Sequence, residues 1–135
     1  MIIVDTNVIA YLYLPTIHTS DAEKLLIQEP VWGAPYLWRS ELRNVLSLYL
    51  RKKLVSLEQA IHIQVEAELL MVENEFQVSS SDILSLVKDS SCSAYDCEFV
   101  ALAKNVNSPL VTNDKKILSD FPSAAKSLQQ ILHKS

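Results

Sequence analysis

The sequence predicts an α/β fold in which mostly parallel strands form one central sheet with helices on both faces. Residues 2–4 are three β-branched apolar residues that end at Asp5, a pattern typical of a buried parallel strand. Residues 110–112 form a second such run shortly before Asp114. Between these runs, short apolar segments alternate with helical patterns, which indicates parallel strands joined by crossover helices.

Prolines, serines and capping patterns divide the chain into its elements. Ser20 with Glu23, and Ser56 with Gln59, resemble capping boxes that begin two helices. Ile61, Val65, Leu69 and Val72 form the apolar stripe of the helix after Ser56, as expected of the side of a helix that packs on a core. The expected strands are residues 2–4, 31–34, 75–78, 110–112 and 123–126. The expected helices are residues 8–14, 21–28, 36–53, 57–73, 80–87, 94–105 and 127–133, with a short one after Asp114.

Composition narrows the class of protein. The 135 residues, 49% of them apolar, predict one domain over residues 1–135 with a substantial core. Gly33 is the single glycine, so neither a Walker loop nor a dinucleotide-binding fingerprint is possible. The net charge of −4 is no nucleic-acid signature, although an acidic site would itself bias it. No apolar run is long enough to span a bilayer, and no secretory signal is expected at the amino terminus. Cys92 and Cys97 are expected to be reduced residues of the core. Together these observations predict a cytoplasmic location.

Two acids follow equivalent strands. Asp5 comes directly after residues 2–4, and Asp114 follows residues 110–112. The carboxyl ends of parallel strands meet at one edge of a sheet, where ligands bind, so both side chains are expected there. Each could instead only cap the helix that follows it, since aspartate is a favoured N-cap. Two acids at equivalent strand ends favour a site.

Glu41 and Asp96 are candidate partners on helices. Glu41 lies in line with Leu37, Val45 and Leu48 on an otherwise apolar side of its helix. A carboxylate in such a place needs a partner or a raised pKa. Alternatively, Glu41 lies at the edge of the stripe, where it contacts water or pairs with an arginine, and this interpretation fits equally. Asp96 lies in the first turn of a helix that is apolar on nearly every side, although a simple capping role with Ser93 also fits. Glu98 is about 200° further around that helix and cannot face the same cavity.

Oxygen ligands without matching histidine or cysteine favour Mg²⁺ or Mn²⁺ over zinc. An acidic pocket holding such an ion can orient water against a phosphodiester and stabilise developing negative charge. The residues therefore predict metal-dependent phosphoryl chemistry. By themselves they do not separate a nuclease from a phosphatase.

The sequence resembles the PIN domain, and in particular the toxin ribonucleases of bacterial VapBC toxin–antitoxin pairs. The matching segments occur in the family's order and cover the chain nearly end to end. They are Ile-Val-Asp-Thr-Asn at residues 3–7, Ser-Glu-Leu at 40–42, Tyr-Asp at 95–96 with Val-Ala-Leu-Ala at 100–103, Leu-Val-Thr-x-Asp at 110–114, and Ser-Leu-Gln-Gln-Ile-Leu at 127–132. The resemblance implies an α/β/α sandwich and a Mg²⁺- or Mn²⁺-dependent endoribonuclease. It also implies a homodimer and a cognate antitoxin partner.

The resemblance further implies roles for individual residues. Asp5, Glu41, Asp96 and Asp114 would be the catalytic, metal-binding acids. Asn7 and Thr112 would orient these carboxylates through hydrogen bonds. Some relatives carry a further acid one turn after the last aspartate, where this chain has Lys115, Lys116 and Ile117. This departure weighs against a tightly bound second metal.

An RNA substrate needs positive charge near the acids. Arg39 and Arg43 share the helix of Glu41 and are candidate phosphate contacts, although a solvated helix face is the alternative. Trp38 and Tyr11 are interpreted as core residues. Two other functions stay open: a non-catalytic PIN-like module that binds a partner, and a receiver or haloacid-dehalogenase-like phosphotransfer domain. The latter fits poorly, because Asn7 stands where that phosphatase carries a second aspartate.

Overall fold

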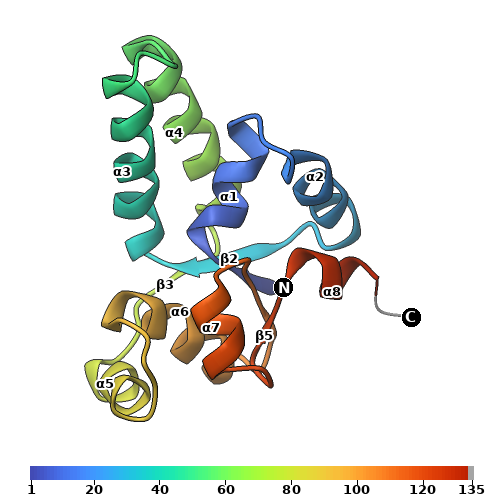
Figure 1. Cartoon of the computed structure of the whole chain (residues 1–135), viewed down its shortest axis with the longest axis vertical. Helices are drawn as coiled ribbons and strands as arrows, with labels where there is room; N and C mark the ends of the chain where they lie inside the picture. Colours follow the sequence, from blue (N-terminus) through green and yellow to red (C-terminus); the bar gives the residue numbers. More distant parts are fainter. Residues whose placement is uncertain (134–135) are drawn as a thin grey trace.

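A five-stranded, wholly parallel sheet is the middle layer of the protein (Figure 1). The computed structural model describes residues 1–133. The strand order is β3-β2-β1-β4-β5, so the first strand lies at the centre. The strands are β1 (Ile2–Val4), β2 (Trp32–Pro35), β3 (Glu75–Phe76), β4 (Leu110–Val111) and β5 (Ala125–Lys126).

Helices cover both faces of the sheet, which confirms the predicted α/β/α sandwich. In Figure 1, α1 to α4 lie on one side of the sheet and α5 to α7 on the other, while α8 packs against α2. The helices are α1 (Thr6–Tyr13), α2 (Thr19–Gln28), α3 (Leu37–Arg51), α4 (Leu57–Met71), α5 (Ser80–Lys88), α6 (Ala94–Asn105), α7 (Lys115–Asp120) and α8 (Leu128–Leu132). Within residues 1–133, no helix has both the length and the apolar character needed to cross a membrane.

The core lies on both faces of the central strands. All three residues of β1 and both residues of β4 are buried, as expected for strands covered by helices on each side. Trp38 is fully buried, and α6 buries Cys97 and residues 99–103. The prediction that α6 is buried nearly all round is therefore confirmed. Cys92 and Cys97 are both free and buried, as expected.

Side-chain caps begin most of the helices, with α2 and α3 as the exceptions among the described residues. Ser56 and Gln59 form the predicted capping box of α4, with bonds in both directions. The capping box predicted at Ser20 is wrong, because α2 begins at Thr19 and its N-cap, His18, makes no side-chain cap bond. The hydroxyl of Thr19 instead accepts the amide of Thr16 at 3.0 Å, and this turn starts the helix before Ser20.

The orientation predicted for α4 is also wrong. Its apolar stripe, defined above, faces solvent, and the four side chains are between 48% and 65% exposed. The side of α4 that packs on the molecule instead buries Ala60, Ala67 and Met71. Small residues let α4 lie close to its neighbours, α3 and β2, and the larger side chains therefore remain outside.

Strand register brings the site together. Val4 pairs with Val111, and the amide of Asp5 donates to the carbonyl of Val111 at 2.9 Å. The segments after β1 and β4 therefore leave the sheet side by side at the same edge. β2 also runs parallel to β1, so α3 begins at this edge as well.

Candidate active site

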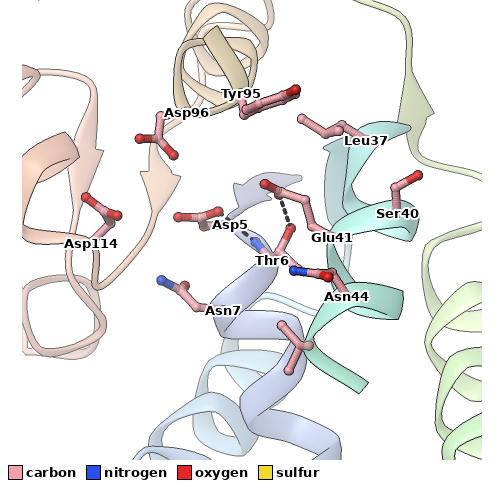
Figure 2. A pocket seen from close by; sticks show the side chains of 11 residues that line it. Asp5, Thr6, Asn7, Leu37, Ser40, Glu41, Asn44, Tyr95, Asp96 and Asp114 are labelled. Atoms are coloured by element: carbon pink, nitrogen blue, oxygen red, sulfur yellow. Dashed lines mark hydrogen bonds between the residues drawn. The ribbon is translucent and has the colours of Figure 1, made fainter. Parts of the chain in front are cut away.

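The four predicted acids line one open cavity of about 430 Å³ at the carboxyl edge of the sheet. Figure 2 shows Asp5 between Asp114 and Asp96 on one side and Glu41 on the other. Asp5 follows β1, Asp114 follows β4, Glu41 lies in the second turn of α3, and Asp96 lies in the first turn of α6. Residues more than a hundred positions apart in sequence therefore line one cavity.

Asp5 is the buried centre of this group. Its Oδ1 accepts the amide of Thr6 at 2.8 Å, and its Oδ2 accepts the hydroxyl of Thr112 at 2.6 Å. Burial raises the pKa of Asp5 to about 6 despite these bonds, and repulsion from Asp96 and Asp114 adds to the rise. Asp5 is thus both the N-cap of α1 and a member of the acidic cavity.

Thr112 connects two of the acids. While its hydroxyl donates to Asp5, its oxygen accepts the amide of Asp114 at 3.0 Å. Oδ1 of Asp114 in turn accepts the amide of Ile117 at 3.0 Å as the N-cap of α7. Thr112 is fully buried, so the relative position of the two carboxyl-bearing segments is well defined.

Glu41 is held by a residue that sequence reasoning missed. The hydroxyl of Thr6 donates to Oε1 of Glu41 at 2.7 Å. Partial burial raises the pKa of Glu41 to about 7, and repulsion from Asp5, Asp96 and Glu98 contributes, while the bond from Thr6 opposes the rise. The only sequence signal for Thr6 was its position between Asp5 and the helix, which fits a plain helix start equally.

Asp96 enters the cavity from the opposite layer. Its amide donates to the hydroxyl of Ser93, the N-cap of α6, at 3.1 Å, so the capping interpretation holds in addition to the cavity position. Burial, followed by repulsion from Asp114, raises the pKa of Asp96. Glu98 does not line the cavity, although it lies near enough to Glu41 to affect its pKa.

The donor set fits a hydrated divalent cation. Among residues 1–133, no three His, Cys, Asp or Glu side chains are close enough together to enclose an ion. Mg²⁺ commonly binds through one or two carboxylates and keeps several waters, and an open cavity accommodates such a hydrated ion. Asn7 also lines the cavity, and its buried Oδ1 has no hydrogen-bond partner within the described residues. The structure shows no bond from Asn7 to the carboxylates, so its predicted orienting role stays a prediction.

The two arginines predicted to bind RNA have different surroundings. Arg39 does not line the cavity; it forms a bidentate pair with Glu75, at 2.6 and 2.7 Å, and contacts Glu68 at 3.2 Å. Arg39 is thus held by Glu75 and Glu68, and its predicted contact to RNA stays a prediction. Arg43 is more exposed and donates to Ser40, a cavity residue, at 3.1 Å. Trp38 belongs to the core, as interpreted from the sequence.

Several cavity residues were not predicted as site residues, although some of them lie in the segments that carry the family resemblance or in line with Glu41. They are uncharged residues placed by α3 and by the start of α6, and a single sequence does not distinguish them from ordinary helix residues. They are Leu37, Ser40, Asn44, Val45 and Tyr95.

The fold and the cavity together define an α/β/α protein with an acidic site at the carboxyl edge of a parallel sheet. Residues 2–123 match the family model described as PIN domain, and this chain belongs to the PIN domain family.

Individual relatives agree with this assignment. The chain is 27% identical over 125 residues to "Ribonuclease VapC3" of Pyrobaculum aerophilum, covering 90% of this chain and 95% of that protein. Its fold is similar to PAE2754 of the same organism, with a TM-score of 0.76 and 17% identity over 96% of this chain and 85% of that one. It is also similar to a chain in a toxin–antitoxin complex from Klebsiella pneumoniae, with a TM-score of 0.72 and 15% identity over 95% and 98% of the two chains.

Proposed function

We propose that this protein is a metal-dependent endoribonuclease and the toxin of a toxin–antitoxin pair. The observation that carries the proposal is the convergence of Asp5, Glu41, Asp96 and Asp114 on one cavity, where burial and mutual repulsion raise the pKa of Asp5 to about 6 and that of Glu41 to about 7. Carboxylates that repel one another destabilise the folded protein, and a bound cation removes this repulsion by neutralising their charge. The similarity to a named ribonuclease over 90% of the chain supports RNA as the substrate.

The cavity residues have different proposed roles, which follow from their surroundings. Asp5, Asp96 and Asp114 would hold a hydrated Mg²⁺ or Mn²⁺ partly through its waters, and Glu41 would bind it directly or through water. Thr112 keeps the segments of Asp5 and Asp114 in register. The bound ion supplies positive charge that activates water and stabilises the phosphate oxygens. Glu41, whose pKa is near neutrality, can take up the proton of the attacking water directly or through a second water. Arg43, which donates to the cavity residue Ser40, is the candidate contact to the RNA backbone.

The test is RNA cleavage by the purified protein with Mn²⁺ or Mg²⁺, comparing wild type with Asp5→Asn and Asp96→Asn. Both variants should lose at least about a hundredfold in activity and keep their circular dichroism spectra, because each change removes one charge and little volume. Asp89→Asn, at an exposed acid after α5, is the matched control and should be fully active. An Asp5→Asn protein with wild-type activity contradicts the mechanism.

The alternative functions give different results in the same preparations. A non-catalytic partner-binding module has no need of the ion, so calorimetry would then detect no Mn²⁺ binding. A phosphotransfer domain would instead leave a phosphoaspartate at Asp5, detectable by mass spectrometry.

An antitoxin is the proposed protein partner, as in the complex from Klebsiella pneumoniae. Induced expression of this chain should arrest growth, and co-expression of a small neighbouring gene with a DNA-binding amino half should restore it. Arrest that persists with Asp5→Asn would separate toxicity from RNA cleavage. A homodimer and a cytoplasmic location stay predictions, to be checked by sedimentation and by fractionation.

A further inference from the structure

The cavity has two chemically different halves. Asp5, Asp96 and Asp114 form one half, and Glu41 lies between the halves. The other half has no charged side chain among the described residues that line it. It consists of Leu37, Val45, Tyr95, Ser40 and Asn44. Figure 2 shows Tyr95 along one side of this half, between Asp96 and Leu37, with Ser40 and Asn44 across from it on α3.

Tyr95 is placed where an aromatic ring can meet a ligand. Its side chain is 63% exposed, although it is adjacent in sequence to Asp96 at the mouth of the cavity. Within residues 1–133 its hydroxyl makes no hydrogen bond that would hold the ring in the fold. Leu37, partly buried, is a second apolar surface on the facing helix. The two side chains therefore offer flat and apolar contact beside the acids.

A nucleotide matches this division. Its phosphate belongs with the acidic half, where a cation would neutralise both partners, and its base then extends into the uncharged half. Base–aromatic stacking tolerates any base, whereas the amide of Asn44 offers a donor and an acceptor to a base edge. A base in a duplex is already stacked and paired, so only an unpaired base can enter.

We propose that Tyr95, Leu37 and Asn44 form a nucleobase subsite beside the acidic half of the cavity. This inference rests on the proposed ribonuclease function. It adds the position of the base and the residue on which the base stacks.

The first experiment measures cleavage of a single-stranded oligoribonucleotide and of the same sequence in a hairpin stem. Wild type should cut the single strand and leave the stem intact. Tyr95→Leu should raise KM for the single strand about fivefold or more with little change in kcat, and Tyr95→Phe should behave as wild type, because stacking needs the ring alone. Tyr36→Leu is the matched control, since Tyr36 is 55% exposed but does not line the cavity.

The second experiment is independent of catalysis. Base protons of ribonucleoside monophosphates, followed by NMR in the presence of Mg²⁺, should shift upfield with wild type and with Tyr95→Phe, and not with Tyr95→Leu. An unchanged KM and unchanged shifts in Tyr95→Leu would overturn the subsite, as would equal effects of Tyr36→Leu or equal cutting of the stem. If wild type cuts no RNA at all, the proposed function fails; if it cuts RNA without dependence on Tyr95, only the subsite fails.

Discussion

At the scale of single residues, the site is made from side chains that also build the fold. Asp5 caps α1, Asp114 caps α7, and both line the cavity. A cap needs a carboxylate oxygen near backbone amides, and these bonds occupy only some of its lone pairs. The same aspartate can therefore cap a helix and still present an oxygen atom to the cavity, so the capping role does not exclude the predicted ligand role.

The hydrogen bond from Thr6 to Glu41 leads to a prediction at the scale of single residues. Thr6→Val keeps the shape but removes the hydroxyl that donates to Glu41, so Mn²⁺ affinity should fall about tenfold or more, as is typical when a group that orients a metal-binding carboxylate is lost. Thr6→Ser should retain most of the affinity. Calorimetric titration with Mn²⁺ measures this without any RNA. Equal affinity in Thr6→Val and wild type would show that the bond does not orient Glu41 for the ion.

At the scale of elements, α4 has its large apolar residues outside and its alanines inside. Ile61→Gln with Leu69→Gln should cost less than about 1 kcal/mol in unfolding free energy, since both side chains are more than half exposed. Urea unfolding of the variant and of wild type measures this difference.

Ala67→Leu is the matched change on the buried side of α4. Ala67 is fully buried, so the added volume should cost about 1–3 kcal/mol. If the double glutamine variant is instead the strongly destabilised one in urea unfolding, the described orientation of α4 is incorrect.

The junction between α3 and β3 gives a second prediction at this scale. The Glu75 carboxylate is 2% exposed and accepts two bonds from Arg39 and one from Trp38, at 2.8 Å. Burial alone would raise the pKa of Glu75, but these bonds outweigh it and lower the pKa. Glu75→Ala should cost about 2–3 kcal/mol in urea unfolding, because donors are left unpaired.

RNA cleavage by folded Glu75→Ala should stay near wild type, since this junction lies outside the cavity. Arg39→Met should behave similarly, being destabilised but active. A loss of RNA affinity in Arg39→Met, with Arg43→Met unaffected, would return Arg39 to the role that the sequence suggested.

At the scale of the whole molecule, the acidic cavity should make stability depend on pH. The folded-state pKa values of Asp5 and Glu41, about 6 and about 7, lie above their ordinary values of 3.8 and 4.5. The folded state therefore binds more protons, and the stability from these two groups is fully present below about pH 4 and lost as the pH rises through 6 and 7. For Asp5 the whole loss of stability over this range is on the order of 3 kcal/mol.

Thermal unfolding of metal-free protein between pH 5 and pH 8 measures this effect. Asp5→Asn with Glu41→Gln should be more stable than wild type at pH 8, and this difference should shrink towards pH 5. Added Mn²⁺ should stabilise wild type more at pH 8 than at pH 5, because protons compete with the ion. A constant difference between the two proteins across this range would contradict the raised pKa values.

Most of the fold could be predicted from local pattern. The strands that precede Asp5 and Asp114, the capping box of α4 and the apolar character of α6 were all readable, because each depends on neighbouring residues. Which side of α4 faces the core could not be predicted from the sequence. Periodicity shows that a helix has an apolar side, but the packing of Ala60 and Ala67 decided which side faces inward.

The sequence by itself determined the order of the elements, the parallel sheet and the four candidate acids, two at strand ends and two on helices. Only the tertiary structure decided that these acids share one cavity, that Thr6 and Thr112 hold them, and that uncharged residues from α3 and α6 complete the cavity. The physical reason is that short-range propensities act along the chain, whereas burial, repulsion and hydrogen bonding among distant residues depend on how strand register and helix packing place them in space.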